Sequence, residues 1–180
     1  MRWVIVSAVG GWIWVFCAAT EAGGGNTTLE DPVVVRVQGH FQPENTWPVQ
    51  VVGEHDLPRH IWSRVRHLVA FRIHRHASDG TTKVDRQIYL LRTSGLYQQA
   101  AAVLRHSTTS REYVWCQLAA VLVHEAAHTA PLTERQALAA EAAQLRHCLF
   151  AGHLHTENGW SGVAYLGKVE ARLRNPREHH

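Results

Sequence analysis

Residues 121–141 read VLVHEAAHTAPLTERQALAAE, and this stretch decides both the fold and the chemistry that we expect of the chain. Two histidines, His124 and His128, lie four positions apart, and Glu125 follows the first. On an α-helix, residues i and i+4 share one face about one turn apart, so both imidazoles can reach one metal ion. Glu125 lies about 100° further round such a helix, near the open side of the ion. The pattern therefore predicts His124 and His128 as metal ligands and Glu125 as a general base.

Zinc is the ion that we expect at this pair of imidazoles. A bound Zn²⁺ lowers the pKa of a coordinated water to about 7, which makes hydroxide available at neutral pH. Because the chain has 14 histidines, the same pattern could also arise by chance. The neighbouring residues favour a metal site. Residues 121–123 and 129–130 are uncharged, as expected around a site that must exclude bulk water.

Two capping boxes indicate a pair of helices around this motif. A T-x-x-E box at 109–112 predicts a helix that runs from about residue 110 to 128. Pro131 interrupts the pattern, and a T-x-x-Q box at 133–136 predicts a second helix to about Phe150. The metal motif therefore lies near the end of one helix, and the next helix must turn back past it.

The stretch VLVHEAAHTA resembles the active-site helix of the zincin metallopeptidases, and the resemblance covers about residues 109–150. A glutamate on the following helix resembles the glutamate-zincin branch, in which that residue completes the zinc shell. Small exported bacterial proteins share a short form with E-x-x-A, here at 134–137. This match implies Zn²⁺ as cofactor and Glu134 as the third ligand. Glu141, on the same stripe of the second helix, is the alternative ligand or an acceptor for a histidine N–H.

The resemblance implies an exported zinc-dependent hydrolase, a metallopeptidase acting on a peptide or protein substrate. In that chemistry a zinc-bound water, activated by Glu125, attacks a peptide carbonyl. Two alternatives stay open: a non-catalytic zinc-binding protein with the same ligands, and an exported interaction protein in which HExxH arose by chance. Substitution of Glu125 by Gln distinguishes a catalyst from a structural site, and stoichiometric zinc distinguishes both from the chance motif.

Two cysteines are placed to meet across the predicted helical hairpin. A hairpin centred near Pro131 places residue 128 opposite about 134, residue 121 opposite about 141 and Cys116 opposite about 146, so Cys148 comes near Cys116. The pair lies at the end of the hairpin that is far from the metal. The two expected outcomes are a disulfide that clamps the metal-bearing helices and a pair of buried free thiols.

The first 25 residues, MRWVIVSAVGGWIWVFCAATEAGGG, have the layout of a secretory signal peptide. Arg2 precedes an apolar run that ends in small residues, and cleavage after Ala19 or Ala22 fits this pattern. The run is also about long enough for an uncleaved membrane anchor, for which roughly 20 residues are needed, and a buried helix is the third alternative. We predict a signal peptide or membrane anchor over 1–22, a linker over 23–31 and a metal-binding domain over 32–180. The domain would then be secreted or periplasmic, or anchored so that it faces outside the cytoplasm.

The charge pattern argues against a nucleic-acid partner. The net charge of +3 comes almost wholly from arginines scattered between acids, since Lys83 and Lys168 are the only lysines. Such a weak and dispersed charge does not form a basic patch. The basic stretch RHIWSRVRH, at 59–67, favours a solvated helix face, and a membrane contact is expected only if the N-terminal segment is uncleaved.

We expect an α+β fold in which a small mixed or antiparallel sheet packs on the metal-bearing helix and the helix that follows, as in zincins. Apolar β-branched patterns predict strands at 32–41, 49–52 and 84–91, whereas 95–106 is typical of a short helix. Residues 59–76 fit a helix at their start and a strand at their end. Because zincins run an edge strand beside the metal, where a peptide can pair, VDRQIYLL at 84–91 is the candidate edge strand.

Two further groups of residues are weaker candidates. Three tyrosines, Tyr89, Tyr97 and Tyr113, are candidates to polarise a substrate carbonyl, against an ordinary role in packing. A second cluster, His153, His155 and Glu157, suggests another metal site, against a solvated loop.

Overall fold

The computed structural model describes residues 2–8, 11–17, 31–41, 48–76, 82–106, 112–128, 133–152 and 162–175. This part of the chain contains six α-helices: α1 (Pro32–Gln38), α2 (Arg59–Val65), α3 (Gly95–His106), α4 (Glu112–Ala127), α5 (Glu134–Phe150) and α6 (Gly162–Arg174). It also contains a short 3₁₀ turn, Glu54–Asp56, and one sheet. The expected α+β class is therefore correct, and the sheet is mixed.

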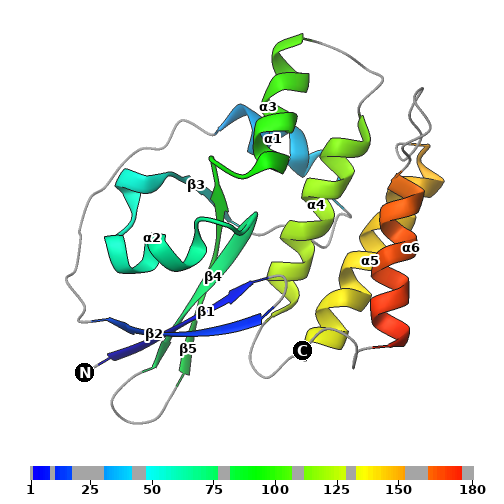
Figure 1. The fold of residues 1–180 in the computed structure, drawn as a ribbon. Helices are drawn as coiled ribbons and strands as arrows, with labels where there is room; N and C mark the ends of the chain where they lie inside the picture. The colour runs from blue at the N-terminus through cyan, green and yellow to red at the C-terminus, as the bar shows by residue number, and fades with distance from the viewer. Residues whose placement is uncertain are drawn as a thin grey trace.

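The sheet has the strand order β2-β1-β4-β5-β3. Its strands are β1 (Arg2–Ala8), β2 (Gly11–Cys17), β3 (Val49–Val52), β4 (Ala70–His76) and β5 (Thr82–Leu91). β4 and β5 are antiparallel, with Ala70 opposite Leu90, whereas β3 runs parallel to β5. β1 and β2 form an antiparallel hairpin, and β1 pairs with the outer side of β4 (Figure 1).

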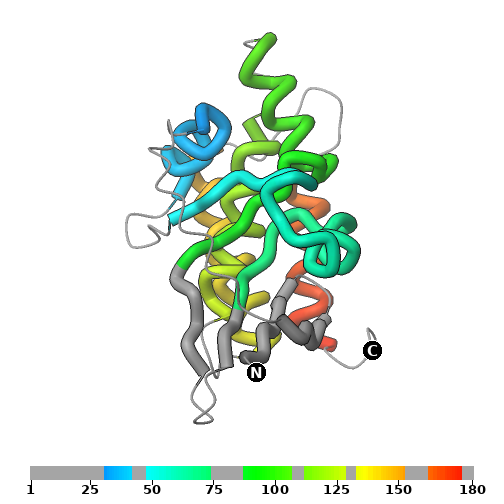
Figure 2. The backbone as a smooth tube through the Cα atoms, turned by 90° about the vertical axis from the view of Figure 1, so that its left-hand side faces the viewer, coloured from blue at the N-terminus to red at the C-terminus, as the bar shows by residue number. Residues whose placement is uncertain are grey.

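Helices cover both faces of the sheet because its apolar side chains alternate between the faces. The face toward α2 carries Val52, Phe71, Ile73 and Leu91, and the face toward α4 carries Ala70, Ile88 and Leu90. Seen from the side of α2 (Figure 2), the strands lie between that helix and the pair formed by α4 and α5. The sheet thus provides a rigid support beneath α4.

α4 is the central element of the described chain. Every side chain from 114 to 126 is buried. The helix lies between the sheet and α5, and α1 and α3 cover its N-terminal half (Figure 1). A helix that is mostly apolar all round is expected in a core. This position carries the polar residues His124 and Glu125 into the interior of the protein.

α6 packs on the far side of α5 and closes a second apolar layer. Its buried residues Leu166 and Val169 contact a cluster on α5 that includes Leu138, Ala142 and Leu145. Cys116 of α4 and Cys148 of α5 lie within the same cluster at disulfide distance, with Cα atoms 6.0 Å apart. The predicted cysteine pairing is therefore confirmed, and the disulfide suggests a protein that works outside the cytoplasm.

The strand predicted at 32–41 is wrong, because this segment contains helix α1. Asp31 is the N-cap and accepts a hydrogen bond from the backbone N–H of Val33 at 2.9 Å. Pro32 occupies the first helical position, where its fixed φ angle suits a helix. Val33, Val34 and Val37 then share one buried face, so local capping and packing override the strand preference of valine.

The strand predicted at 84–91 is confirmed as part of β5, but its predicted position at an edge is wrong. β5 lies between β4 and β3 and pairs with both. Its hairpin partner occupies one side, and the parallel strand β3, which starts at Val49, occupies the other. The pairing partners of a strand depend on tertiary packing, which the local pattern does not contain.

The other segment predictions agree with the structure. Residues 59–76 contain helix α2 followed by strand β4, and the basic face of α2 is exposed while Ile61 and Val65 are buried. The strand at 49–52, the helix at 95–106 and the helix that ends at Phe150 are also present. The T-x-x-Q box holds the start of α5, since the backbone N–H of Thr133 donates to Oε1 of Gln136 at 2.9 Å. Thr109 of the other box lies outside the described residues.

The N-terminal prediction concerns a processing step, and it stays a prediction. The expected cleavage positions and residues 23–30 of the linker lie outside the described residues, whereas Asp31, the last linker residue, is the N-cap of α1. The alternative of a buried helix is wrong, because residues 2–8 and 11–17 form the strands β1 and β2. Among the helices that are described, none is long and apolar enough to cross a membrane.

We expect removal of the disulfide to destabilise the protein by about 3–4 kcal/mol, because the bridge closes a loop with a sequence separation of 32. Urea unfolding of the double variant Cys116→Ala/Cys148→Ala against wild type measures this difference. As a control, neither Cys116 nor Cys148 of the wild type should be alkylated before reduction. Complete alkylation of both without reductant would show that the bridge does not form.

Candidate metal centre

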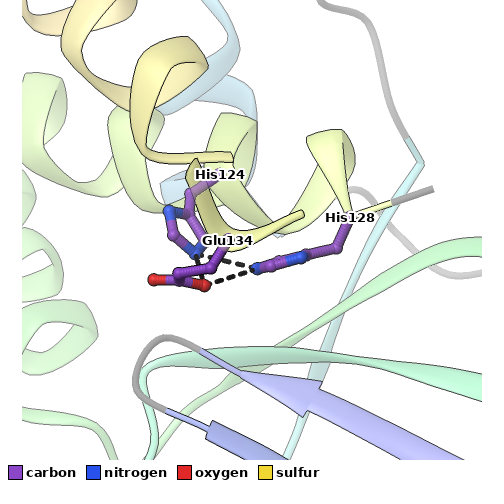
Figure 3. A group of neighbouring side chains, drawn as sticks. All are labelled: His124, His128 and Glu134. Atoms are coloured by element: carbon purple, nitrogen blue, oxygen red, sulfur yellow. Dashed lines mark hydrogen bonds and ion pairs between the residues drawn. The ribbon is translucent and has the colours of Figure 1, made fainter. Parts of the chain in front are cut away.

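Three side chains from two helices converge at one end of the α4–α5 pair (Figure 3). His124 and His128 come from the end of α4, and Glu134 is the first residue of α5. Their ligand atoms all lie within 4.8 Å of one another. The two Nε2 atoms are 3.0 Å apart, and Oε2 of Glu134 lies 3.6 Å from Nε2 of His124 and 3.3 Å from Nε2 of His128. This cluster could hold a metal ion.

Local sequence places these ligands together. The spacing of four residues at the end of α4 puts both imidazoles on one face. Thr133 then starts α5 as its N-cap, so that Glu134 follows the turn directly. A carboxylate in the first turn of a helix is also stabilised by the positive end of the helix dipole. The motif and the capping box together therefore bring Glu134 to the two histidines.

Glu141 lies behind His124 rather than in the cluster. Its Oε2 is 2.9 Å from Nδ1 of His124, and both side chains are fully buried. An Nδ1–H that donates to this carboxylate leaves Nε2 of His124 as the lone-pair donor that faces Glu134 and His128. Of the two roles expected for Glu141, this geometry fits the acceptor for a histidine N–H.

The hairpin brings residue 128 to residue 134 as expected, since Nε2 of His128 lies 3.3 Å from Oε2 of Glu134. Glu141, which we expected opposite residue 121, instead contacts His124, about one helical turn further along α4.

A buried arginine from the sheet supports the end of α4. The side chain of Arg72 is fully buried, and its Nη1 donates to the backbone carbonyls of Glu125 at 3.4 Å and Ala126 at 3.3 Å. The last carbonyls of a helix lack partners within the helix, and a cation there is favourable. The sequence analysis missed Arg72. The sequence feature that could have indicated Arg72 is its position between the apolar residues Phe71 and Ile73, both of which are buried in strand β4.

Glu125 is fully buried beside the cluster. It follows His124 directly in α4, and its backbone is held by Arg72. The structure therefore places the expected base in a dry environment, next to one of the candidate ligands.

The buried acids change the protonation of the histidine that they contact. Burial lowers the pKa of His124, but hydrogen bonds to Glu134 and Glu141 outweigh this effect and raise the pKa to about 9. Burial raises the pKa of Glu134, but its contacts with His124 and His128 hold that pKa far below its usual range. Without a metal ion, His124 is thus protonated at neutral pH, and its positive charge offsets the negative charge of these carboxylates.

Two residues of α6 that the sequence analysis did not single out contact the acids of the site. The Tyr165 hydroxyl donates to Oε1 of Glu141 at 2.5 Å, and Nη2 of Arg172 donates to Oε1 of Glu134 at 3.1 Å. Burial and the charge of Glu141 raise the pKa of Tyr165 well above its usual range. No local pattern marks either residue, since both contacts form between distant parts of the chain.

The three tyrosines that were candidates for polarising a carbonyl have other contacts. Tyr97 donates to Oδ2 of Asp31 at 2.9 Å, and burial followed by this hydrogen bond raises the pKa of Tyr97 to about 12. Tyr89 stacks on Phe71 with ring centroids 5.2 Å apart, and Tyr113 packs against the main core. These contacts fit the packing interpretation.

The second metal cluster that the sequence suggests lies outside the described residues, because His153, His155 and Glu157 all do.

No protein-family model matches the chain, and neither a curated protein nor a solved structure matches it.

We expect metal binding at pH 7.5 to release about one proton from His124, because this histidine is protonated in the metal-free protein up to pH about 9. Calorimetry of zinc binding in buffers with different heats of ionisation measures the release. The variant His147→Asn, which changes an exposed histidine of α5, should release the same amount. Binding without proton release would show that His124 is neutral before the ion arrives.

The same proton should affect the stability of the metal-free fold. The pKa of His124 in the folded chain is above its ordinary value of 6.5, so the stabilisation is complete below about pH 6.5 and is lost as the pH rises through about 9. Thermal unfolding of the protein in chelator, from pH 6 to pH 10, measures this loss. A stability that rises over this range would contradict the assignment.

Proposed function

We propose that this protein is an exported zinc-dependent hydrolase of the zincin type, a metallopeptidase that acts on peptides or proteins. The observation that carries the proposal is the convergence of His124, His128 and Glu134 beside the buried carboxylate of Glu125. Two imidazoles and one carboxylate are a ligand set of catalytic zinc sites, in which the fourth position stays open for water.

The separations within the cluster support an ion of this kind. Zinc lies about 2.0–2.1 Å from its nitrogen and oxygen ligands, so in tetrahedral geometry two ligand atoms are about 3.3 Å apart. The observed separations of 3.0, 3.3 and 3.6 Å lie on both sides of this value. Ligands at these separations need only small movements of the side chains to bind the ion.

Each residue of the site has a defined task in the proposed reaction. Zinc supplies a Lewis acid that lowers the pKa of a bound water and polarises the substrate carbonyl. Glu125 accepts a proton from the attacking water and returns it to the leaving amine. Glu141 holds His124 in the tautomer that presents Nε2, and Arg72 holds the backbone of Glu125.

We propose β4, in place of 84–91, as the strand beside which a peptide substrate binds. Arg72 of β4 contacts the end of α4 that carries the metal ligands. β1 pairs with the outer side of β4, with Val6 opposite Ile73. Removal of residues 1–22 as a signal peptide would free this side of β4, and an extended peptide could then add to the sheet.

We expect the variant Glu125→Gln to bind one zinc ion per chain and to lose peptide hydrolysis by about 10²–10⁴-fold, because the amide cannot accept the proton. Metal analysis of the untagged protein and cleavage of a peptide library measure the two properties. Glu134→Gln should lose zinc and hydrolysis together, whereas Glu112→Gln, at the other end of α4, should keep both.

Two outcomes would contradict the proposal in different ways. Absence of stoichiometric zinc from the wild type would make HExxH a chance motif in an interaction protein. Stoichiometric zinc without hydrolysis of any peptide in the library would favour the non-catalytic zinc-binding protein.

A further inference from the structure

Glu134 and Glu141 each have one carboxylate oxygen in contact with a histidine side chain and the other in contact with a residue of α6. Glu134 directs Oε2 to the two histidines, while its Oε1 accepts from Arg172. Glu141 directs Oε2 to Nδ1 of His124, while its Oε1 accepts from Tyr165. Both carboxylates are thus fixed from the side opposite the histidines.

The two contacts of α6 follow from one matched helical register. Glu134 and Glu141 lie seven residues apart on α5, and Tyr165 and Arg172 lie seven residues apart on α6, so each pair occupies one stripe of its helix. The contacts run in antiparallel order, with Tyr165 on Glu141 and Arg172 on Glu134. Apolar contacts between α5 and α6 hold the stripes face to face.

We propose that α6 forms the outer shell of the metal centre, with Tyr165 and Arg172 as positioning residues that control how Glu141 and Glu134 meet the ion and its ligands. This inference rests on the metal site of the proposed function and deepens it. It assigns a role to a helix that carries no ligand of the cluster.

Tyr165 acts through Glu141. The Tyr165 hydroxyl donates a hydrogen bond to the carboxylate of Glu141, which also accepts one from His124. It therefore fixes the orientation of this carboxylate relative to the imidazole. A fixed acceptor holds Nδ1 of His124 on the side of Glu141, so that Nε2 is the ring atom that faces the cluster. Outer partners of this type typically change metal affinity by about 10–100-fold.

Arg172 acts on the third ligand directly. It occupies Oε1 of Glu134, so Oε2 is the oxygen that remains for the ion. A carboxylate that binds through one oxygen leaves the fourth tetrahedral position to water. Without Arg172, Oε1 of Glu134 would also be able to reach a bound ion, which would raise the coordination number of that ion.

Two variants test these roles, with a third as a matched control. We expect Tyr165→Phe to weaken Zn²⁺ binding by about 10–100-fold, measured by competition with a chromophoric chelator. We expect Arg172→Met to weaken the visible absorption of bound Co²⁺, since four-coordinate Co²⁺ absorbs far more strongly than Co²⁺ with more ligands, and Arg172→Lys to restore it. Glu170→Gln should change neither property, because it removes only the exposed ion pair between Glu170 and Arg146, another contact of α6 with α5.

Every outcome decides the proposal. Equal zinc affinity for wild type and Tyr165→Phe, or an equal loss in Glu170→Gln, would show that α6 only packs on α5, and the metal site itself would stand. An unchanged Co²⁺ spectrum in Arg172→Met would overturn the role of Arg172. A wild-type protein that binds no ion would overturn both this inference and the proposed function. Thermal unfolding in chelator verifies that each variant is folded.

Discussion

When a helix is enclosed on all sides, the hydrogen-bond partners of its polar side chains must come from within the protein. α4 is such a helix, and it carries His124 and Glu125 in a stretch of buried residues. An unsatisfied polar group in an apolar interior costs roughly 2–7 kcal/mol, and an isolated charge costs more. The positions of the neighbouring elements follow from this constraint. β4 supplies Arg72 to the backbone carbonyls at the end of α4, α5 supplies Glu134 and Glu141 to the side chain of His124, and α6 fixes both acids from outside.

The charges gathered around the end of α4 explain why this arrangement suits a divalent cation. Among the described residues around the end of α4 are three carboxylates, those of Glu125, Glu134 and Glu141, and two guanidinium groups: Arg172 pairs with Glu134, and Arg72 donates to the backbone carbonyls of Glu125 and Ala126. With neutral imidazoles these groups sum to one negative charge, and a divalent ion changes the sum to one positive charge. The raised pKa of His124 has the same origin, because a proton offsets the excess of negative charge in the absence of the ion.

The local parts of this arrangement can be predicted from the sequence. The i, i+4 spacing of the histidines, the capping box before Glu134 and the distances of the cysteines from the helical break depend on helix geometry alone. They predict two helices that bring candidate metal ligands together and are joined by a disulfide, and the structure has this arrangement. The pairing of residues 128 and 134 across the hairpin was expected, whereas the position of Glu141 beside His124 rather than residue 121 was not, since it depends on how the two helices pack.

Features that depend on tertiary packing were not predicted. The valines of α1 favour a strand in isolation, but Asp31 and Pro32 start a helix whose valines pack against the core. The central place of β5 depends on which strands lie beside it. Arg72, Tyr165 and Arg172 reach partners that are 53, 24 and 38 positions away or more along the chain, and no periodicity connects such residues.

The disulfide and the metal cluster lie at opposite ends of the same two helices, and this has a consequence for the order of assembly. Once Cys116 and Cys148 are joined, the start of α5 can explore only a small volume near the end of α4. Glu134 lies only six positions after His128 along the chain, so this short connection already keeps it near the histidines, and the disulfide additionally restricts the angle between the two helices. A bridge at one end and a short connection at the other would hold the three candidate ligands close together before any ion binds.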